Sequence, residues 1–295
     1  MVKRKIALIG ANGMLASMFQ HCLPHGTDLH RFDLPDFDVT DGERVRQVLL
    51  PLQPDIILNC SAFTRVDECE TQQQAAFAVN GEGPKNLAVA AQEVGATLVH
   101  ISTDFVFSGA KQTPYTELDA PAPLSVYGQS KWKGEQAILE SGLKDYYIVR
   151  TSWLYGPCGG NFVETMRRLA CERETIGVVA DQLGTPTYTG DLVEAVWALL
   201  GLIPGSSVPP APAGIYHFSN EGQCSWYEFA CEIMACLKRR GGTVKVREVR
   251  PLRTEEYPVA ANRPAYSVLS KEKYRRVTGR CIPSWLQSLE RYLLG

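Results

Sequence analysis

The sequence predicts an α/β fold with a doubly wound parallel sheet and a smaller α/β unit in the C-terminal half. The first half alternates short apolar, β-branched runs with longer segments of helical period, as βαβ units do. A glycine turn directly follows the first of these runs. Right-handed crossovers between parallel strands place helices on both faces of the sheet.

The elements of the first half can be assigned in order. The apolar runs predict strands over residues 5–9, 28–32, 55–60, 97–101 and 146–150. The segments between them predict helices over residues 14–23, 42–50, 72–94 and 126–140. Because the helices lie between successive strands, the pattern is that of parallel crossover units.

The alternation is looser after residue 150. Helices are expected over residues 161–171, 189–200, 226–238 and 284–293, and a strand over residues 214–219. Residues 203–214 hold four of the 18 prolines and predict a surface loop. We expect residues 1–155 and 186–222 to form the sheet domain, and residues 156–185 and 223–295 to form the smaller domain over the strand ends.

Composition excludes several classes of protein. A net charge of −2 gives no electrostatic reason to bind nucleic acid or an anionic membrane, and no apolar run approaches the ~18 residues of a membrane span. The apolar run of residues 6–9 ends at Gly10, too early for a secretion signal. Nine scattered cysteines form no Cys-x-x-Cys pair, so reduced thiols in a cytoplasmic protein are expected.

The segment after the first strand has the pattern of a dinucleotide-binding turn. Gly10 and Gly13 allow a tight turn and bring backbone N–H groups close to a pyrophosphate, which the start of the next helix also attracts. The spacing matches the GxxGxxG pattern of short-chain dehydrogenases, with Ala16 in place of the third glycine. Two glycines alone also fit an ordinary βα turn, but the context favours a Rossmann sheet that binds a nicotinamide dinucleotide.

Asp33 strengthens this interpretation, because it lies 20 residues after Gly13 and directly after the second predicted strand. A carboxylate there is placed to accept hydrogen bonds from the adenosine ribose. It would repel a 2′-phosphate, although His30 and Arg31 partly offset that repulsion. NADH is therefore favoured and NADPH stays open, while Asp38 either approaches the adenine or caps the helix that begins near Thr40.

Three side chains predict ketone reduction. Thr103 follows the fourth predicted strand at its carboxyl end, where open α/β sheets bind ligands. Tyr127 and Lys131 are four residues apart and share one face of a predicted helix. Reduction of a ketone leaves an alkoxide that needs a proton, and a tyrosine whose pKa is lowered by a lysine is a suitable donor. Thr103 is expected to orient the carbonyl oxygen.

A longer set of motifs resembles the dTDP-4-dehydrorhamnose reductase family, a branch of the extended short-chain dehydrogenases. The matching segments are residues 102–109 (STDFVFSG), 114–117 (PYTE), 127–131 (YGQSK), 134–135 (GE), 150–156 (RTSWLYG), 181–187 (DQLGTPT) and 263–267 (RPAYS). The resemblance implies reduction of the C4 ketone of a dTDP-linked 4-keto-6-deoxy sugar with NADPH or NADH. It also implies that Thr103, Tyr127 and Lys131 are catalytic.

The same resemblance assigns binding residues. It implies a cofactor site formed by Gly10, Gly13, Met14, Leu15, Asp33, Asp38, Val39, Ala62, Phe63, Thr64, Tyr127 and Lys131. A substrate site is expected to include Thr103, Tyr127, Trp153, Gln182 and Arg263. Trp153 also fits a core aromatic, and Arg263 either meets substrate phosphate or forms a structural salt bridge.

Two alternative functions fit the same sequence features. The fold also resembles the regulatory subunit of methionine adenosyltransferase, which binds a dinucleotide but serves a partner enzyme, and another deoxy-sugar would suit the same chemistry. Residues 64–70 carry three carboxylates but lack the fixed spacing of a metal site, so a solvated loop or helix start is expected. The sequence is compatible with a homodimer.

Overall fold

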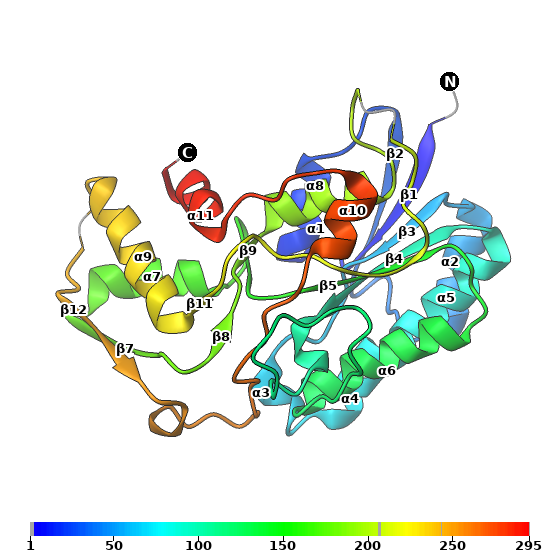
Figure 1. The fold of residues 1–295 in the computed structure, drawn as a ribbon. Helices are drawn as coiled ribbons and strands as arrows, with labels where there is room; N and C mark the ends of the chain where they lie inside the picture. The colour runs from blue at the N-terminus through cyan, green and yellow to red at the C-terminus, as the bar shows by residue number, and fades with distance from the viewer. Residues whose placement is uncertain (1–2, 206–207, 243, 295) are drawn as a thin grey trace.

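The computed structural model describes residues 3–205, 208–242 and 244–294. Its centre is a six-stranded parallel sheet with the strand order β10-β5-β4-β3-β1-β2 (Figure 1). The strands are β1 (Arg4–Ile9), β2 (Thr27–Phe32), β3 (Ile56–Asn59), β4 (Thr97–Thr103), β5 (Tyr146–Thr151) and β10 (Gly214–His217). All six were predicted to within two residues, and the parallel sheet is confirmed.

Helices cover both faces of the sheet, as alternating side chains of β1 illustrate. Ile6 and Leu8 belong to a hydrophobic cluster with residues of α1 and α8, whereas Ala7 and Ile9 pack with residues of α2 and α5. Successive side chains of a strand point to opposite faces, so two helical layers are required. The flanking helices are α1 (Met14–His21), α2 (Gly42–Leu52), α5 (Gly83–Val94), α6 (Val126–Glu140), α8 (Thr189–Leu199) and α10 (Glu272–Thr278).

The helix predicted over residues 72–94 is unbroken from residue 73 to residue 94 but not uniform. It divides into α4 (Gln73–Phe77), a π-helical turn (Ala78–Glu82) and α5. The π turn contains Asn80, which is 1% exposed and hydrogen-bonds both backbone groups of Phe63 and the Ser130 hydroxyl. This irregular turn therefore ties the loop after β3 to α6, and such turns are frequent near functional sites.

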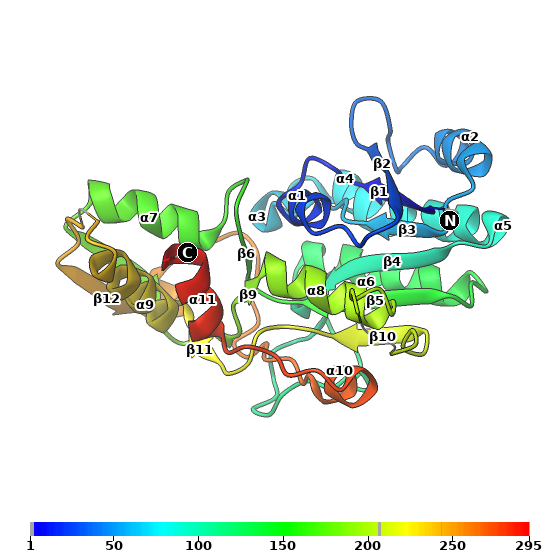
Figure 2. The same ribbon diagram turned by 90° about the horizontal axis from the view of Figure 1, so that it is seen from above.

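A second set of elements lies beyond the carboxyl ends of the strands. Figures 1 and 2 show α7, α9, β12 and α11 together at the end of the molecule away from β1, β2 and β3. Here β7 pairs with β12 in parallel, and a separate hydrophobic cluster includes Val163, Phe229 and Leu289. The elements are α7 (Phe162–Glu172), β7 (Thr175–Val179), α9 (Trp226–Arg239), β12 (Glu248–Leu252) and α11 (Trp285–Leu294). The domain boundaries stated above stay a prediction.

Short elements complete the described chain. They are α3 (Val66–Cys69), two 3-10 turns (Asp104–Val106 and Thr254–Glu256), and the strand pairs β6 (Leu154–Tyr155) with β9 (Thr187–Tyr188) and β8 (Leu183–Gly184) with β11 (Cys224–Ser225). Of the predicted loop over residues 203–214, residues 206–207 lie outside the described part, and the rest before β10 forms neither helix nor strand. Among the described helices, none is both long and apolar enough to cross a membrane.

Candidate active site

The glycine turn lies where the strand order reverses, between β1 and β3. Gly10 has a φ of +74°, and a Cβ there would lie 2.6 Å from the backbone nitrogen of Ser61. Only glycine satisfies both the conformation and this close approach. Gly13 forms the N-cap of α1 without a side-chain hydrogen bond to the helix. The turn therefore presents a helix N-terminus at the position where doubly wound sheets bind phosphates.

A cavity of about 260 Å³ adjoins this turn. Six of the predicted cofactor residues line it: Gly10, Gly13, Asp33, Asp38, Val39 and Ala62. The Asp33 carboxylate accepts hydrogen bonds from the backbone N–H groups of Asn12 (2.7 Å) and Leu34 (2.8 Å), which fix it beside the turn. Asp38 bonds both donors of Thr40, while Asp41 caps α2, so the expected helix cap moves to Asp41.

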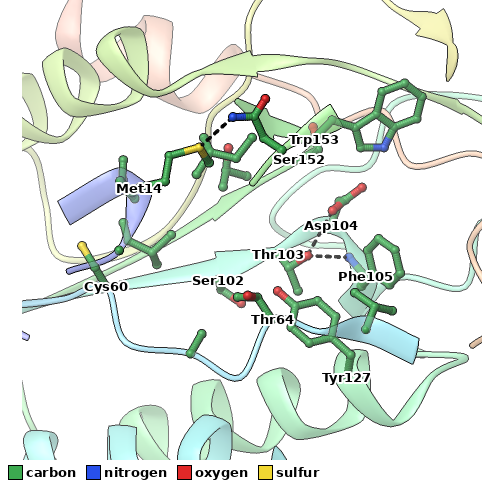
Figure 3. Close-up of a pocket in the computed structure, with 18 of the residues that line it drawn as sticks. Met14, Cys60, Thr64, Ser102, Thr103, Asp104, Phe105, Tyr127, Ser152 and Trp153 are labelled. Atoms are coloured by element: carbon green, nitrogen blue, oxygen red, sulfur yellow. Dashed lines mark hydrogen bonds between the residues drawn. The ribbon is translucent and has the colours of Figure 1, made fainter. Parts of the chain in front are cut away.

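A larger cavity of about 710 Å³, which we call the main cavity, opens beside the carboxyl ends of β4 and β5 (Figure 3). It shares Gly13, Cys60 and Ala62 with the first cavity. Predicted residues that line it are Gly13, Met14, Leu15, Ala62, Thr64, Thr103, Tyr127, Lys131, Trp153 and Arg263. Elements far apart in sequence thus bring the predicted catalytic and binding residues to one space.

The start of α6 fixes the position of Tyr127. Ser125 caps the helix through the backbone N–H of Gly128, and Glu70 accepts a hydrogen bond from Val126 at 2.9 Å. A Cβ on Gly128 would lie 2.3 Å from the carbonyl oxygen of Phe105, so glycine lets the helix pack directly on the turn after β4. As a result the Tyr127 hydroxyl points toward Thr103 in the main cavity (Figure 3).

The electrostatics around Tyr127 differ from the sequence expectation. Burial raises the pKa of Tyr127 above its usual value instead of lowering it. The Lys131 side chain has partners other than the phenol: Nζ donates to the carbonyl oxygen of Ile101 at 2.7 Å and lies 3.2 Å from Nε2 of His100. Burial also lowers the pKa of Lys131 to about 8. The spacing places both side chains at the main cavity, but the hydrogen-bond partners of Lys131 are Ile101 and His100 and not Tyr127.

Asp104 is an unpredicted neighbour of this group. It is 2% exposed, accepts a hydrogen bond from the Thr103 hydroxyl at 3.1 Å, and lines the main cavity. Burial raises the pKa of the Asp104 carboxyl to about 6. Thr103 is therefore held between Asp104 and the backbone N–H of Phe105, which orients its hydroxyl.

Trp153 forms the far wall of the main cavity. Its φ is +47°, a rare conformation outside glycine, and its ring stacks on Trp226 with centroids 3.6 Å apart. A Cβ on Gly184 would lie 2.4 Å from the Trp153 ring, so this glycine makes room for the indole. Sequence reasoning missed Trp226 and Phe162, since only the tertiary fold brings α7 and α9 beside Trp153.

Three predicted residues, Phe63, Gln182 and Arg263, have surroundings that differ from those expected for a cofactor or substrate contact. Phe63 is absent from the lining of the cavities described above and packs with the cluster of Cys69 and Val126. Gln182 lines a neighbouring apolar cavity of about 310 Å³, which shares Trp226 and Arg263 with the main cavity, and its amide donates to Thr254.

Arg263 lines both the main and the apolar cavity but forms an ion pair with Asp67 at 2.8 Å. Although burial opposes it, the guanidinium holds the pKa of Asp67 below its usual value. Of the two roles expected for Arg263, this structure contains the salt bridge. The acidic segment is thereby accounted for: Glu68 pairs with Arg65, and Glu70 receives the first N–H of α6.

Comparison with known proteins agrees with this geometry. The family model described as "RmlD substrate binding domain" matches residues 4–294. The chain is 41% identical over 290 residues to the spore coat polysaccharide biosynthesis protein SpsK of Bacillus subtilis, covering 98% of this chain and 96% of that protein. It is 38% identical over 288 residues to a dTDP-4-dehydrorhamnose reductase of Sinorhizobium fredii, covering 97% and 96%.

A solved structure is similar throughout. The crystal structure of dTDP-4-dehydrorhamnose reductase from Bacillus anthracis in complex with NADP has a TM-score of 0.90 and 43% sequence identity, and the match covers 99% of each chain.

Proposed function

The chain belongs to the family of the RmlD substrate binding domain, and from this premise we propose that it is a dTDP-4-dehydrorhamnose reductase. It would reduce the C4 ketone of dTDP-4-dehydro-L-rhamnose to dTDP-L-rhamnose with NADPH or NADH. The observation that carries the proposal is the main cavity, where Thr103, Tyr127 and Lys131 lie next to the glycine turn.

The residues at the turn fit a dinucleotide. The close approach at Gly10 leaves no room for a side chain, and the N-terminus of α1 carries no side-chain cap. Eleven of the residues proposed to hold the cofactor line the two cavities, and Phe63 lies behind them in the cluster of Cys69 and Val126. The eleven are Gly10, Gly13, Met14, Leu15, Asp33, Asp38, Val39, Ala62, Thr64, Tyr127 and Lys131. When bound, a reduced nicotinamide supplies the hydride, and the relative in complex with NADP supports use of the phosphorylated form.

The side chains of this protein would supply the proton and the orientation. Tyr127 would donate its hydroxyl proton to the alkoxide oxygen, because its hydroxyl reaches the cavity beside Thr103. Thr103, held by Asp104 and the Phe105 N–H, would orient the ketone oxygen. Lys131 would support the phenolate once its ammonium turns away from the Ile101 carbonyl.

The far end of the cavity suits a nucleotide sugar. Trp153 offers an aromatic wall for the sugar ring, Gln182 offers an amide beside the apolar cavity, and Arg263 offers a guanidinium between the two cavities. Phosphate would compete with Asp67 for Arg263. Binding energy at the diphosphate can hold the remote ketone in position, so a free keto-sugar should be a much poorer substrate.

Related proposals concern the setting of the enzyme. We propose residues 1–155 and 186–222 as the dinucleotide domain and residues 156–185 and 223–295 as the substrate domain, from which α10 reaches back to pack on the sheet. A cytoplasmic location is also proposed, and no disulfide joins the nine cysteines, all of which lie in described residues. A homodimer is compatible with the sequence. The regulatory alternative is disfavoured, since the similar proteins named above include reductases.

Turnover tests the proposal. Purified protein is mixed with dTDP-4-dehydro-L-rhamnose and NADPH or NADH, and loss of nicotinamide absorbance and formation of dTDP-L-rhamnose are followed. The same assay with the free keto-sugar is the control for nucleotide recognition. Tight dinucleotide binding without oxidation in the presence of the nucleotide sugar would reject the assignment. Capture of methionine adenosyltransferase in a defined complex would then favour the regulatory role.

A further inference from the structure

A chain of buried hydrogen bonds runs behind the main cavity to Lys131. The Asn59 Oδ1 accepts from the backbone N–H of Ser61 at 3.0 Å and from its hydroxyl at 2.6 Å. The Asn59 Nδ2 lies 3.0 Å from Nδ1 of His100, and Nε2 of His100 lies 3.2 Å from Nζ of Lys131. The side chains of Asn59, His100 and Lys131 are at most 1% exposed, so water cannot take the place of these partners.

The backbone of Ser61 fixes the direction of the whole chain. A peptide N–H can only donate, so the Asn59 oxygen must face Ser61 and its NH₂ group must face His100. Nδ1 of His100 is then an acceptor. Burial, together with the nearby lysine, lowers the pKa of His100 well below its usual value, so the ring is neutral. A neutral imidazole carries one ring proton, which must therefore be on Nε2.

This tautomer constrains Lys131. The Nε2–H of His100 points at Nζ, and an ammonium group has three donors and no acceptor. A charged Lys131 would place donor against donor at 3.2 Å, whereas a neutral amine accepts from Nε2–H and still donates to Ile101. The contact with His100 is thus compatible only with the uncharged lysine.

We propose that Asn59 and His100 are positioning residues that favour the neutral form of Lys131 while its side chain lies against His100, and that the charged form is favoured when the side chain turns into the main cavity. We call this change of charge with side-chain position the lysine switch; its role in catalysis rests on the proposed reductase function. In that setting the charged state of Lys131, which supports Tyr127, is coupled to the position of the side chain.

The other charged and titratable groups around Lys131 act in both directions. Burial lowers its pKa, while Glu135 on the same helix and Cys60 after β3 raise it. Glu135 is itself paired with Arg150 of β5 at 2.6 Å, which reduces its effect on the lysine. His100 of β4 is the group in direct contact with Nζ. The direction of the hydrogen bond at His100 therefore has the most direct effect on whether Lys131 is charged or neutral.

The first test is the tautomer of His100, read by nitrogen-15 NMR of histidine-labelled protein without substrate. His217 is an internal reference, since its Nδ1 lies 3.1 Å from the Tyr115 carbonyl and its Nε2 lies 3.3 Å from an Arg150 nitrogen. The two buried histidines should show opposite tautomers, with the proton on Nε2 in His100 and on Nδ1 in His217. His100→Gln assigns the signal. A proton on Nδ1 of His100 would overturn the proposal.

The second test reverses the chain with Asn59→Asp. One carboxylate oxygen can accept from Ser61 while the other accepts from Nδ1–H, so the ring proton moves and Nε2 becomes an acceptor for the ammonium. The pKa of Lys131, followed by carbon-13 NMR, should rise by about one to two pH units. The same substitution in a His100→Gln background controls for the added charge, and there the rise should fall by at least half.

An equal rise in both backgrounds would assign the effect to charge alone and reject the switch. Neither measurement needs turnover. An inactive protein with the expected tautomer would therefore contradict the reductase proposal but not the switch, and an active enzyme with the opposite tautomer would do the reverse.

Discussion

Replacement of Gly10 by alanine tests the dinucleotide turn most sharply. The added methyl group meets two obstacles: the φ of +74°, and the backbone of residues 60 and 61, which a Cβ would approach to 2.6–2.9 Å. Backbone atoms cannot rotate aside as a side chain can, so β1 and the segment after β3 must separate. The variant should lose both stability and dinucleotide affinity.

Gly26 provides a matched control that separates the two costs. Its φ is also +74°, but a Cβ there has no neighbour within 4 Å among the described residues. Gly26→Ala should cost about 1–2 kcal/mol, the penalty of a left-handed conformation for alanine. Gly10→Ala should cost roughly 1–3 kcal/mol more, as overpacking does in a buried site.

Urea denaturation gives the free energies of unfolding, and fluorescence titration at a temperature where both variants are folded gives the dinucleotide affinity. Gly10→Ala should weaken binding at least ~10-fold, which corresponds to about 1.4 kcal/mol, while Gly26→Ala leaves it unchanged. Equal stability losses in the two variants, together with unchanged affinity in Gly10→Ala, would refute the close approach at the turn.

Three further predictions concern the proton donor, a buried ion pair and the response to acid. Tyr127→Phe should lower turnover roughly 10²–10⁴-fold while dinucleotide affinity stays near that of the wild type, and full activity would remove Tyr127 from the mechanism. Glu135→Ala leaves the fully buried Arg150 without its carboxylate partner and should lower the free energy of unfolding, measured by urea denaturation, by about 3–5 kcal/mol. Glu93→Ala, in the exposed ion pair with Arg46, should lower it by less than about 1 kcal/mol. Burial lowers the pKa of His217 to about 3, so the unfolded chain binds a proton first and stability falls as pH drops below about 6.5. The loss between pH 7 and 5.5 should be about 1 kcal/mol smaller in His217→Gln, and an equal loss would show that His217 is not the titrating group.

The sheet and its helices could be predicted from sequence because local pattern and tertiary environment agree. In β1 every residue of the apolar run is buried between two helical layers, and Asn161 and Ser225 cap the helices that follow them. The π turn at Ala78–Glu82 has no such pattern. Likewise β12 is largely exposed and contains Pro251, so its pairing with β7 depends on the tertiary fold.

The sequence indicated many of the residues that line the candidate site, but few of the contacts between them. The spacing placed Tyr127 and Lys131 on one face of α6. It could not indicate that the lysine contacts His100, which lies 31 residues before it in the sequence, instead of Tyr127. Trp226 and Asp67 were missed as partners of Trp153 and Arg263 for the same reason. Such contacts join distant segments, and their direction depends on hydrogen-bond geometry that a sequence does not contain.

The transfer of hydride to C4 is the central claim, and isotopic labelling tests it directly. The enzyme is supplied with dTDP-4-dehydro-L-rhamnose and NADPH that carries deuterium in place of the transferred hydrogen, and the product is analysed by NMR. The account predicts one deuterium at C4 of dTDP-L-rhamnose, with the hydroxyl proton drawn from Tyr127 and hence from solvent. A product without deuterium, or with deuterium at another carbon, would contradict it.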